Sequence, residues 1–409
     1  MEKDVVGTVK TAVKQGTQAA LQPPSSSSNN QQQQQQQQAY AAPSILNIIP
    51  AAAAGLADIT GRGVQQFVHP GTLMGPAEVQ LLQQRASGAA AADDTWRQAL
   101  QALQASTPLA YNHHALKDFQ CEWEGPKVGH EELVEKDGVM VYQQAVMWLV
   151  SGDERYAANA AGIIDAWATT NKRFCGKNAP LEAGWAIASF ARAAELLKHS
   201  WPGWADSGAE GRFMGWVDAL LMPQLDHEML HRLPLANWQT TVAECKAQLA
   251  ILTGRRRLWD EALAWWHKVF DAYVKPCGEC GETQRDLFHS QFGLGGLIQL
   301  AEMAWQQGLD LYCYQNSRLF TAMEFHAFIT NGGKPQECCY QLKGIGFLPC
   351  GWEVGYNHYK GRMGWEMPQT AKMLAAHRPE KYVFHWGLGT LTHYRTAEAL
   401  HTQRPPAPA

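Results

Sequence analysis

The stretch ETQRDLFHSQFGLGGLIQLAEMAWQQGLDLY, residues 282–312, carries the clearest sign of the fold class. From Phe292 to Gln307 its apolar residues recur three and four positions apart, at Leu294, Leu297, Ile298, Ala301, Ala304 and Trp305. This spacing is typical of one face of an α-helix. The polar residues from Glu282 to His289 come directly before this segment, so we expect them near the end of a helix.

The same periodicity recurs outward along the chain. It predicts helices over residues 258–273, 182–198 and 153–170, and a further helix over 139–149 that forms a hairpin with 153–170. Apart from short stretches around 340–350, we find no run of alternating residues that is typical of a strand. Helices joined by short turns favour an all-α fold, an incomplete (α/α) toroid of helical hairpins. The competing interpretation is a helical solenoid, which the lack of a fixed repeat disfavours.

Composition divides the chain into a low-complexity head and a folded part. Residues 1–62 include Ser25–Ser28 and the unbroken tract Gln31–Gln38. Such a segment has too little apolar surface to offset the entropy of ordering, so we expect it to be disordered. Residues 63–400 are long enough to bury the core of one toroidal domain, and 401–409 are expected to form a flexible tail.

Charge and hydropathy exclude some classes of protein. The formal net charge of −4 argues against a nucleic-acid-binding protein, which would show a basic stripe. No stretch reaches the roughly 20 apolar residues of a membrane-spanning helix. No apolar segment of an ordinary secretory signal follows Met1, so the sequence leaves the compartment open.

The nine cysteines allow two interpretations. Cys277 and Cys280 have the spacing of half a zinc site, and Cys338 and Cys339 could supply the rest. Adjacent cysteines are poor chelators, however, so disulfides or buried thiols fit better. We therefore expect no metal and no cofactor.

Polar clusters lie between the predicted helices, and in a toroid such helix ends converge on a central cleft. They are Asn112-His113-His114, Leu235 to Gln239, Glu282 to His289, and Tyr356-Asn357-His358-Tyr359. These residue types suit β-elimination on a uronate. An amide or a cation neutralises the carboxylate, while a tyrosine or histidine moves the proton from C5 and protonates the leaving oxygen.

Each cluster also has an ordinary structural interpretation. Asn237 could cap the helix that follows it, and His289 could form an ion pair with Asp286 at helical spacing. His113 and His114 could form a surface turn, and the run from Tyr356 to Tyr359 could be packed aromatics. A glycoside hydrolase would instead use two carboxylates, for which Glu282, Asp286 and Glu353 are the candidates.

Several segments, in this order, resemble the alginate lyase family. They are His69-Pro70-Gly71, the hairpin from Asp137 to Trp167, Asn237-Trp238, Glu282-Thr283-x-Arg285-Asp286-x-x-His289-x-Gln291, Tyr356-Asn357-His358-Tyr359, Arg378-Pro379-Glu380 and Gly389 to Thr392. The resemblance spans residues 67–393, nearly all of the folded part. It implies an (α/α) toroid and eliminative cleavage of a 1,4-linked polyuronate such as alginate or glucuronan.

The resemblance also implies roles for individual residues. Asn237 would neutralise the carboxylate, His289 would assist it or act as the base, and Tyr356 or Tyr359 would be the catalytic tyrosine. The residues expected to bind substrate are His113, His114, Trp238, Gln239, Arg285, Gln291, Asn357 and His358. A hydrolase on the same toroid and a non-catalytic carbohydrate-binding relative remain alternatives.

The expected partner is therefore an anionic polysaccharide, with neither nucleic acid nor membrane as a partner. We expect a monomer. The family implies a secreted or periplasmic protein, although no ordinary signal is visible.

Overall fold

The computed structural model describes residues 64, 66–122, 129–231, 234–335, 351–382 and 385–403. The predicted disorder of residues 1–62 and the stretches around 340–350 lie outside these ranges, as do Cys338, Cys339 and Cys350. Helix α18 (Thr396–Gln403) continues past residue 400, where we expected the domain to end, and the rest of the predicted tail is outside the described residues.

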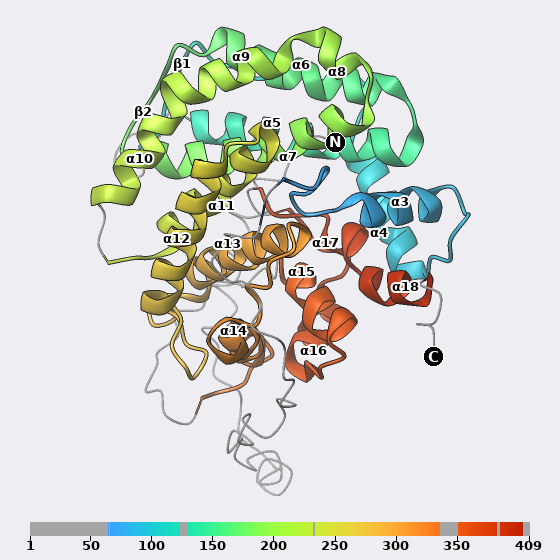
Figure 1. Ribbon diagram of the computed structural model, residues 1–409, viewed down its shortest axis with the longest axis vertical. Coiled ribbons are helices and arrows are strands. Elements are labelled where there is room, and N and C mark those ends of the chain that lie inside the picture. The colour runs from blue at the N-terminus through green and yellow to red at the C-terminus, as the bar shows by residue number, and fades with distance from the viewer. Residues whose placement is uncertain are drawn as a thin grey trace, which may run out of the picture.

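Four helices form the inner layer of a helical toroid (Figure 1), and each packs against the next in chain order. They are α5 (His130–Ser151), α7 (Ala179–Ser200), α11 (Asn237–Thr253) and α13 (Leu287–Gln306). Most residues of α7, α11 and α13 are buried on every side of the helix. Small residues allow this close approach, since a Cβ at Gly296 would lie 2.9 Å from Thr240 Oγ1.

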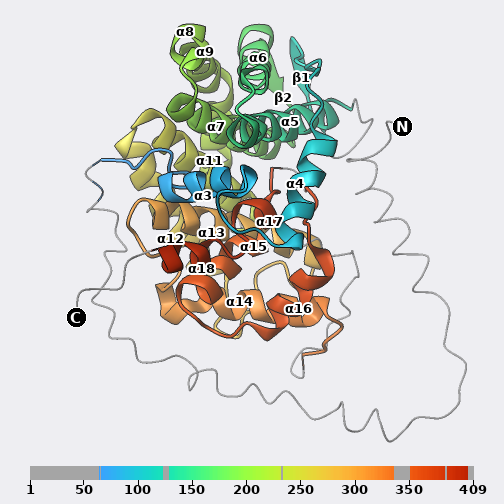
Figure 2. The ribbon, with the colours of Figure 1, turned by 90° about the vertical axis from the view of Figure 1, so that its right-hand side faces the viewer.

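The outer layer consists of helices with one buried and one exposed face, as α6 and α12 illustrate. Helix α6 packs on α5, α12 on α11 and α14 on α13, which produces the hairpins of an (α/α) toroid (Figures 1 and 2). The outer elements are α6 (Glu154–Thr170), α8 (Gly203–Ser207), α9 (Ala209–Trp216), π-helix η2 (Val217–Leu221), α10 (Met222–His231), α12 (Arg256–Tyr273) and α14 (Tyr314–Thr330).

The first and last helices of the described chain lie side by side (Figure 1, blue and red). Arg85 of α3 donates to the carbonyl oxygens of Tyr394 and Arg395, and Trp96 Nε1 of α4 donates to the carbonyl of Leu391 at 2.8 Å. The remaining elements are α3 (Pro76–Ala86), α4 (Asp94–Ser106), α15 (Trp352–Tyr356), π-helix η3 (Asn357–Arg362), α16 (Pro368–His377) and α17 (Gly389–Thr392).

The two strands within the described residues are short and parallel. Strand β1 (Asp118–Gln120) pairs with β2 (Arg173–Cys175), and Phe119 stacks on Phe174 with ring centroids 3.9 Å apart. The predicted all-α toroid is confirmed. None of the described helices is both long and apolar enough to cross a membrane. The six described cysteines, Cys121, Cys175, Cys245, Cys277, Cys280 and Cys313, are free thiols.

Candidate active site

The first residue of helix α11 is tied to the turn that precedes α13. Asn237 Nδ2 donates to Glu282 Oε1 at 2.7 Å, and the Asn237 backbone N–H donates to Glu282 Oε2 at 3.1 Å. Both residues are buried. Because the carboxylate can only accept, it forces the amide nitrogen of Asn237 toward Glu282 and turns Oδ1 away. Oδ1 is buried and has no hydrogen-bond partner, so it can accept a hydrogen bond from a ligand.

Two further donors hold Glu282 in place. Tyr273 O–H donates to Oε2 at 3.0 Å, and Arg285 Nη1 donates to Oε1 at 3.3 Å. Tyr273 reaches the carboxylate because Gly293 leaves room, since a Cβ at this glycine would overlap the tyrosine hydroxyl. The side chain of Arg285 is 51% exposed, so its charge lies at the surface of this cluster.

His289 lies in the first turn of α13 and is oriented by Asp286. Asp286 caps the helix by accepting from the His289 backbone N–H at 2.7 Å, and it also contacts His289 Nδ1 at 2.8 Å. With the Nδ1 proton directed to the carboxylate, Nε2 carries the lone pair of the neutral ring. The imidazole is 26% exposed and can reach a ligand. Burial would raise the pKa of Asp286, but the hydrogen bonds from His289 outweigh it and lower that pKa.

Arg285 connects the two clusters, because its Nε lies 3.7 Å from Asp286 Oδ2 while Nη1 binds Glu282. An amide, a guanidinium and an oriented imidazole thus gather at the beginnings of α11 and α13. This set can bind a carboxylate and move a proton.

Aromatic side chains link His289 to a small cleft. Phe292 lies 5.9 Å from His289 and 5.7 Å from Trp185 between ring centroids, and Leu181, Trp238 and Trp386 complete this cluster. Trp185 lines the cleft between α5 and α7. All five side chains of this cluster are buried, so the cluster packs beside His289 and lines the cleft only through Trp185.

Glu182 also lines this cleft. Burial, with Glu135 and Glu131 nearby, raises the pKa of Glu182 well above its ordinary value. Its Oε2 is buried without a hydrogen-bond partner. Burial therefore favours the neutral form of Glu182, which can donate a hydrogen bond.

The structure separates the Tyr356–Tyr359 run from this cluster, contrary to our expectation of a shared cleft. A Cβ at Gly355 would lie 3.4 Å from Ile298 of α13, nine residues beyond His289 and hence about 13 Å along the helix. Tyr359 is buried and donates its hydroxyl to the carbonyl of Tyr312 at 2.8 Å. Tyr356 is half-buried, and the Arg378 guanidinium lies 5.7 Å from its ring centroid.

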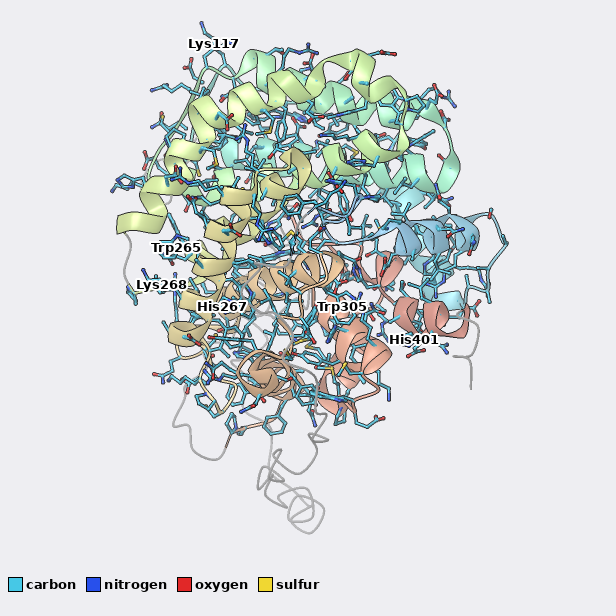
Figure 3. All side chains as sticks on the ribbon, viewed as in Figure 1. Lys117, Trp265, His267, Lys268, Trp305 and His401 are labelled. Carbon is cyan, nitrogen blue, oxygen red and sulfur yellow. The ribbon has the colours of Figure 1, made fainter. Side chains whose placement is uncertain are left out.

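Asn357 and His358 also serve the core rather than this cluster. Asn357 Oδ1 accepts from the Ala397 backbone N–H at 2.9 Å. His358 stacks on Tyr312 with centroids 3.9 Å apart and packs on Trp305 (labelled in Figure 3) near the other end of α13. Burial and the nearby Arg362 lower the pKa of His358.

The other predicted binding residues have mixed positions. His114 Nδ1 contacts Asp137 at 2.8 Å, and Asp137 also accepts from Trp167 of α6, so His114 lies at the junction of α5 and α6. His113 is exposed. Gln239 accepts from the Ala236 backbone N–H at 2.9 Å and thereby caps α11. Gln291 is buried in the first half of α13, near His289 in sequence.

The carboxylates considered for hydrolysis are already occupied. Glu353 forms a two-bond ion pair with Arg378 at 2.8 and 2.7 Å, Asp286 holds His289, and Glu282 accepts four hydrogen bonds. A glycosidase uses a pair of carboxyl groups that are available to the substrate, and none of these three carboxylates is available in this way.

Sequence reasoning missed several residues of this cluster. Glu282 and Asp286 belong to the quoted motif, and the spacing of Asp286 to His289 indicated their contact, but both were considered only as the carboxylates of a hydrolase. Tyr273 and Trp185 occupy apolar positions of helices and carry no separate signal. Glu182 could have been found only from its burial.

Comparison with known proteins gives a consistent result. The sequence model of the alginate lyase family matches residues 17–335, more than half of the chain. No curated protein matches.

Two solved structures illustrate the similarity in fold. A tyrosine-to-phenylalanine variant of alginate lyase A1-III complexed with tetrasaccharide is 16% identical with a TM-score of 0.58, covering 79% of this chain and 97% of the other. A second structure of alginate lyase A1-III is named as coming from Sphingomonas species A1. An alginate lyase from Bacteroides ovatus is 15% identical with a TM-score of 0.53, covering 80% and 100%.

Proposed function

The chain belongs to the alginate lyase family, and we propose that this polysaccharide lyase cleaves a 1,4-linked polyuronate, alginate or glucuronan, at the Asn237–His289 cluster. The observation that carries the proposal is the contact between His289 Nδ1 and Asp286, beside the Asn237 amide that Glu282 orients. It combines an accessible proton carrier with groups that bind a carboxylate.

The reaction begins with neutralisation of the substrate carboxylate. Arg285, which also pairs with Glu282 and Asp286, offers its remaining guanidinium N–H groups at the edge of the cluster, and the second N–H of the Asn237 amide supplies a further donor. Neutralisation makes the C5 proton more acidic, because charge from C5 then spreads onto the carboxyl oxygens. The unpartnered Oδ1 of Asn237 is suited to accept a hydrogen bond from a hydroxyl group of the sugar.

His289 is then the proton carrier that the geometry favours. Its Nε2 removes the C5 proton, the electron pair forms the C4–C5 double bond, and the C4–O bond to the leaving sugar breaks. The imidazolium that results is stabilised by Asp286 and can protonate the leaving oxygen. The products are a new reducing end and an unsaturated uronate at the new non-reducing end.

The tyrosine mechanism expected from the sequence is less well supported. Tyr359 is engaged with a backbone carbonyl, and Tyr356 packs beside Arg378. Its neighbour Gly355 approaches Ile298, which lies about 13 Å along α13 from His289. We therefore assign the proton transfer to His289. The expected monomeric state remains a prediction.

The experiment compares purified variants on polymannuronate, polyguluronate and polyglucuronate. Cleavage is followed by the ultraviolet absorbance of the new double bond. We expect activity on at least one polymer, a loss of at least about 100-fold in His289→Gln, and near-normal activity in Tyr356→Phe. His401→Gln is the matched control, because His401 is exposed on α18 (Figure 3).

Three outcomes would contradict the proposal. Reducing ends that appear without absorbance would indicate a hydrolase, and binding without any product would indicate a non-catalytic relative. Loss of activity in Tyr356→Phe with retention in His289→Gln would return the proton transfer to the tyrosine.

A further inference from the structure

Two histidines and a glutamate converge at the far end of α7 from the cleft. Glu195 and His199 are one helical turn apart, and His69 comes from the segment before α3. His69 Nδ1 lies 2.7 Å from Glu195 Oε1, and His199 Nε2 lies 3.6 Å from Glu195 Oε2. The imidazole rings of His69 and His199 stack with centroids 4.4 Å apart.

The glutamate at the centre of this group is incompletely satisfied. Glu195 is fully buried, and its Oε2 has no hydrogen-bond partner. The distance of 3.6 Å to His199 Nε2 is too long for a hydrogen bond. A buried carboxylate oxygen without a partner costs free energy, so a group that binds Oε2 would be stabilising.

We propose that His69, Glu195 and His199 bind a divalent transition metal ion, with zinc as the best fit. Two imidazoles and one carboxylate form a donor set that zinc accepts, with a fourth position left to water. The three donor atoms lie within 4.8 Å of one another. Ligands at zinc distances in a tetrahedron are about 3.3 Å apart, close to the observed 2.7 and 3.6 Å. Because zinc lies in the plane of each imidazole that binds it, the stacked rings of His69 and His199 must rotate out of their parallel arrangement to share one ion.

The surroundings already hold the ligands in position. Gln307 binds the Val68 backbone N–H at 2.8 Å and the Gly71 carbonyl at 2.9 Å, which fixes the backbone on both sides of His69. The imidazoles of His69 and His199 are 25% and 26% exposed, so an ion and its water can enter from solvent.

The position of the site indicates a structural role. Glu195 is thirteen residues beyond Glu182 of the cleft, about 20 Å along α7. The ion would join the segment before α3 to an inner helix. No spacing in the sequence indicates this group, because His69 is far from Glu195 and His199 in the chain.

The test uses the full chain, stripped with a chelator and titrated with zinc chloride. We expect one zinc per chain and a rise in melting temperature that the chelator reverses. His199→Gln should weaken zinc affinity by more than about 100-fold, because loss of even an outer-shell partner costs 10- to 100-fold. His401→Gln, a substitution of the same kind on the surface, should bind zinc as the wild type does.

Glu195→Gln separates the metal site from a simple ion pair, since an amide is a poor zinc ligand yet still pairs with imidazole. It should also lose zinc binding. Equal zinc affinity in the wild type and in His199→Gln would overturn the proposal, as would a wild type that neither binds zinc nor gains stability from it. Where one of these variants fails to fold the other decides, and one zinc per chain that is lost in Cys277→Ser would place the ion at the cysteine pair and overturn the proposal.

Discussion

At the scale of single residues, the helix caps explain why Asn237 is available for chemistry. The alternative interpretation of Asn237 as a helix cap is wrong, because Ala236 occupies the N-cap position and the Gln239 side chain binds its backbone N–H. Asn237 is the first residue within α11, and its amide is bound by Glu282 instead. At α13, Asp286 is the cap and at the same time the partner of His289.

Asp286→Asn tests whether Asp286 positions and stabilises the His289 imidazole. Asparagine is also a good N-cap, so helix α13 should persist, while the charge that stabilises an imidazolium is lost. We expect kcat on a polyuronate to fall by about 10- to 100-fold with little change in KM. Steady-state kinetics on the polymer cleaved by the wild type give both values.

Asp153→Asn is the matched control, because Asp153 caps α6 in the same way by accepting from the Arg155 backbone N–H. It should leave kcat unchanged. A normal kcat in Asp286→Asn would mean that His289 does not depend on this carboxylate.

At the scale of elements, periodicity predicts helices but not their neighbours. The spacing of residues 292–307 predicted most of α13, and the polar residues before it, expected near the end of a helix, lie at its N-terminal end. The cluster of Asn237 with Glu282 could be expected only from the family pattern. The position of Tyr356 could not be predicted. The pattern of residues in the segment 352–362 does not show which part of α13 this segment packs against.

Gly293→Ala tests the packing of α12 against α13. The added Cβ would overlap the Tyr273 hydroxyl, which donates to Glu282, so that tyrosine must move. We expect the free energy of unfolding to fall by about 1–3 kcal/mol, as for other overpacked cores. Urea unfolding followed by circular dichroism measures the change.

Gly162→Ala in helix α6 is the control, because a Cβ there meets no atom within 4 Å. Alanine favours the helix by up to about 1 kcal/mol relative to glycine, so stability should be unchanged or increased. A Gly293→Ala variant as stable as Gly162→Ala would contradict the tight contact.

At the scale of the whole molecule, buried polar side chains connect the helices of the ring. Glu244 of α11 binds Arg192 of α7 at 3.3 Å and His385 at 2.9 Å, so the C-terminal segment is tied to two inner helices. Removing one partner of such a buried ion pair lowers the free energy of unfolding far more than removing one partner of an exposed pair. Glu302 of α13 forms a second buried ion pair with Arg362, at 2.6 Å.

The Glu302–Arg362 ion pair and the neighbouring His393 make the free energy of unfolding depend on pH. Although burial would raise the pKa of Glu302, the Arg362 guanidinium lowers it to about 2. His393 lies 3.9 Å from Glu302 and 3.2 Å from the Leu73 carbonyl. Burial lowers the pKa of His393 to about 4, and Arg362 adds to this effect while Glu302 opposes it. Burial raises the pKa of Glu380 to about 8, which has the opposite consequence for stability.

His393→Gln isolates one of these contributions. In the unfolded chain His393 is protonated below its ordinary pKa of 6.5, whereas in the folded chain its pKa is about 4. Between these two values the unfolded chain therefore binds a proton that the folded chain does not bind. The stability that the neutral imidazole provides is therefore present above pH 6.5 and is lost as pH falls toward 4, by about 3 kcal/mol. We expect urea unfolding between pH 6.5 and 4 to show a smaller loss of stability in His393→Gln than in the wild type.

The control His401→Gln should keep the wild-type dependence of unfolding free energy on pH, because that side chain is exposed in the folded chain too. All three proteins share Glu380, so its contribution cancels when their slopes of unfolding free energy against pH are compared. An unchanged slope in His393→Gln would exclude His393 as the source of the pH dependence.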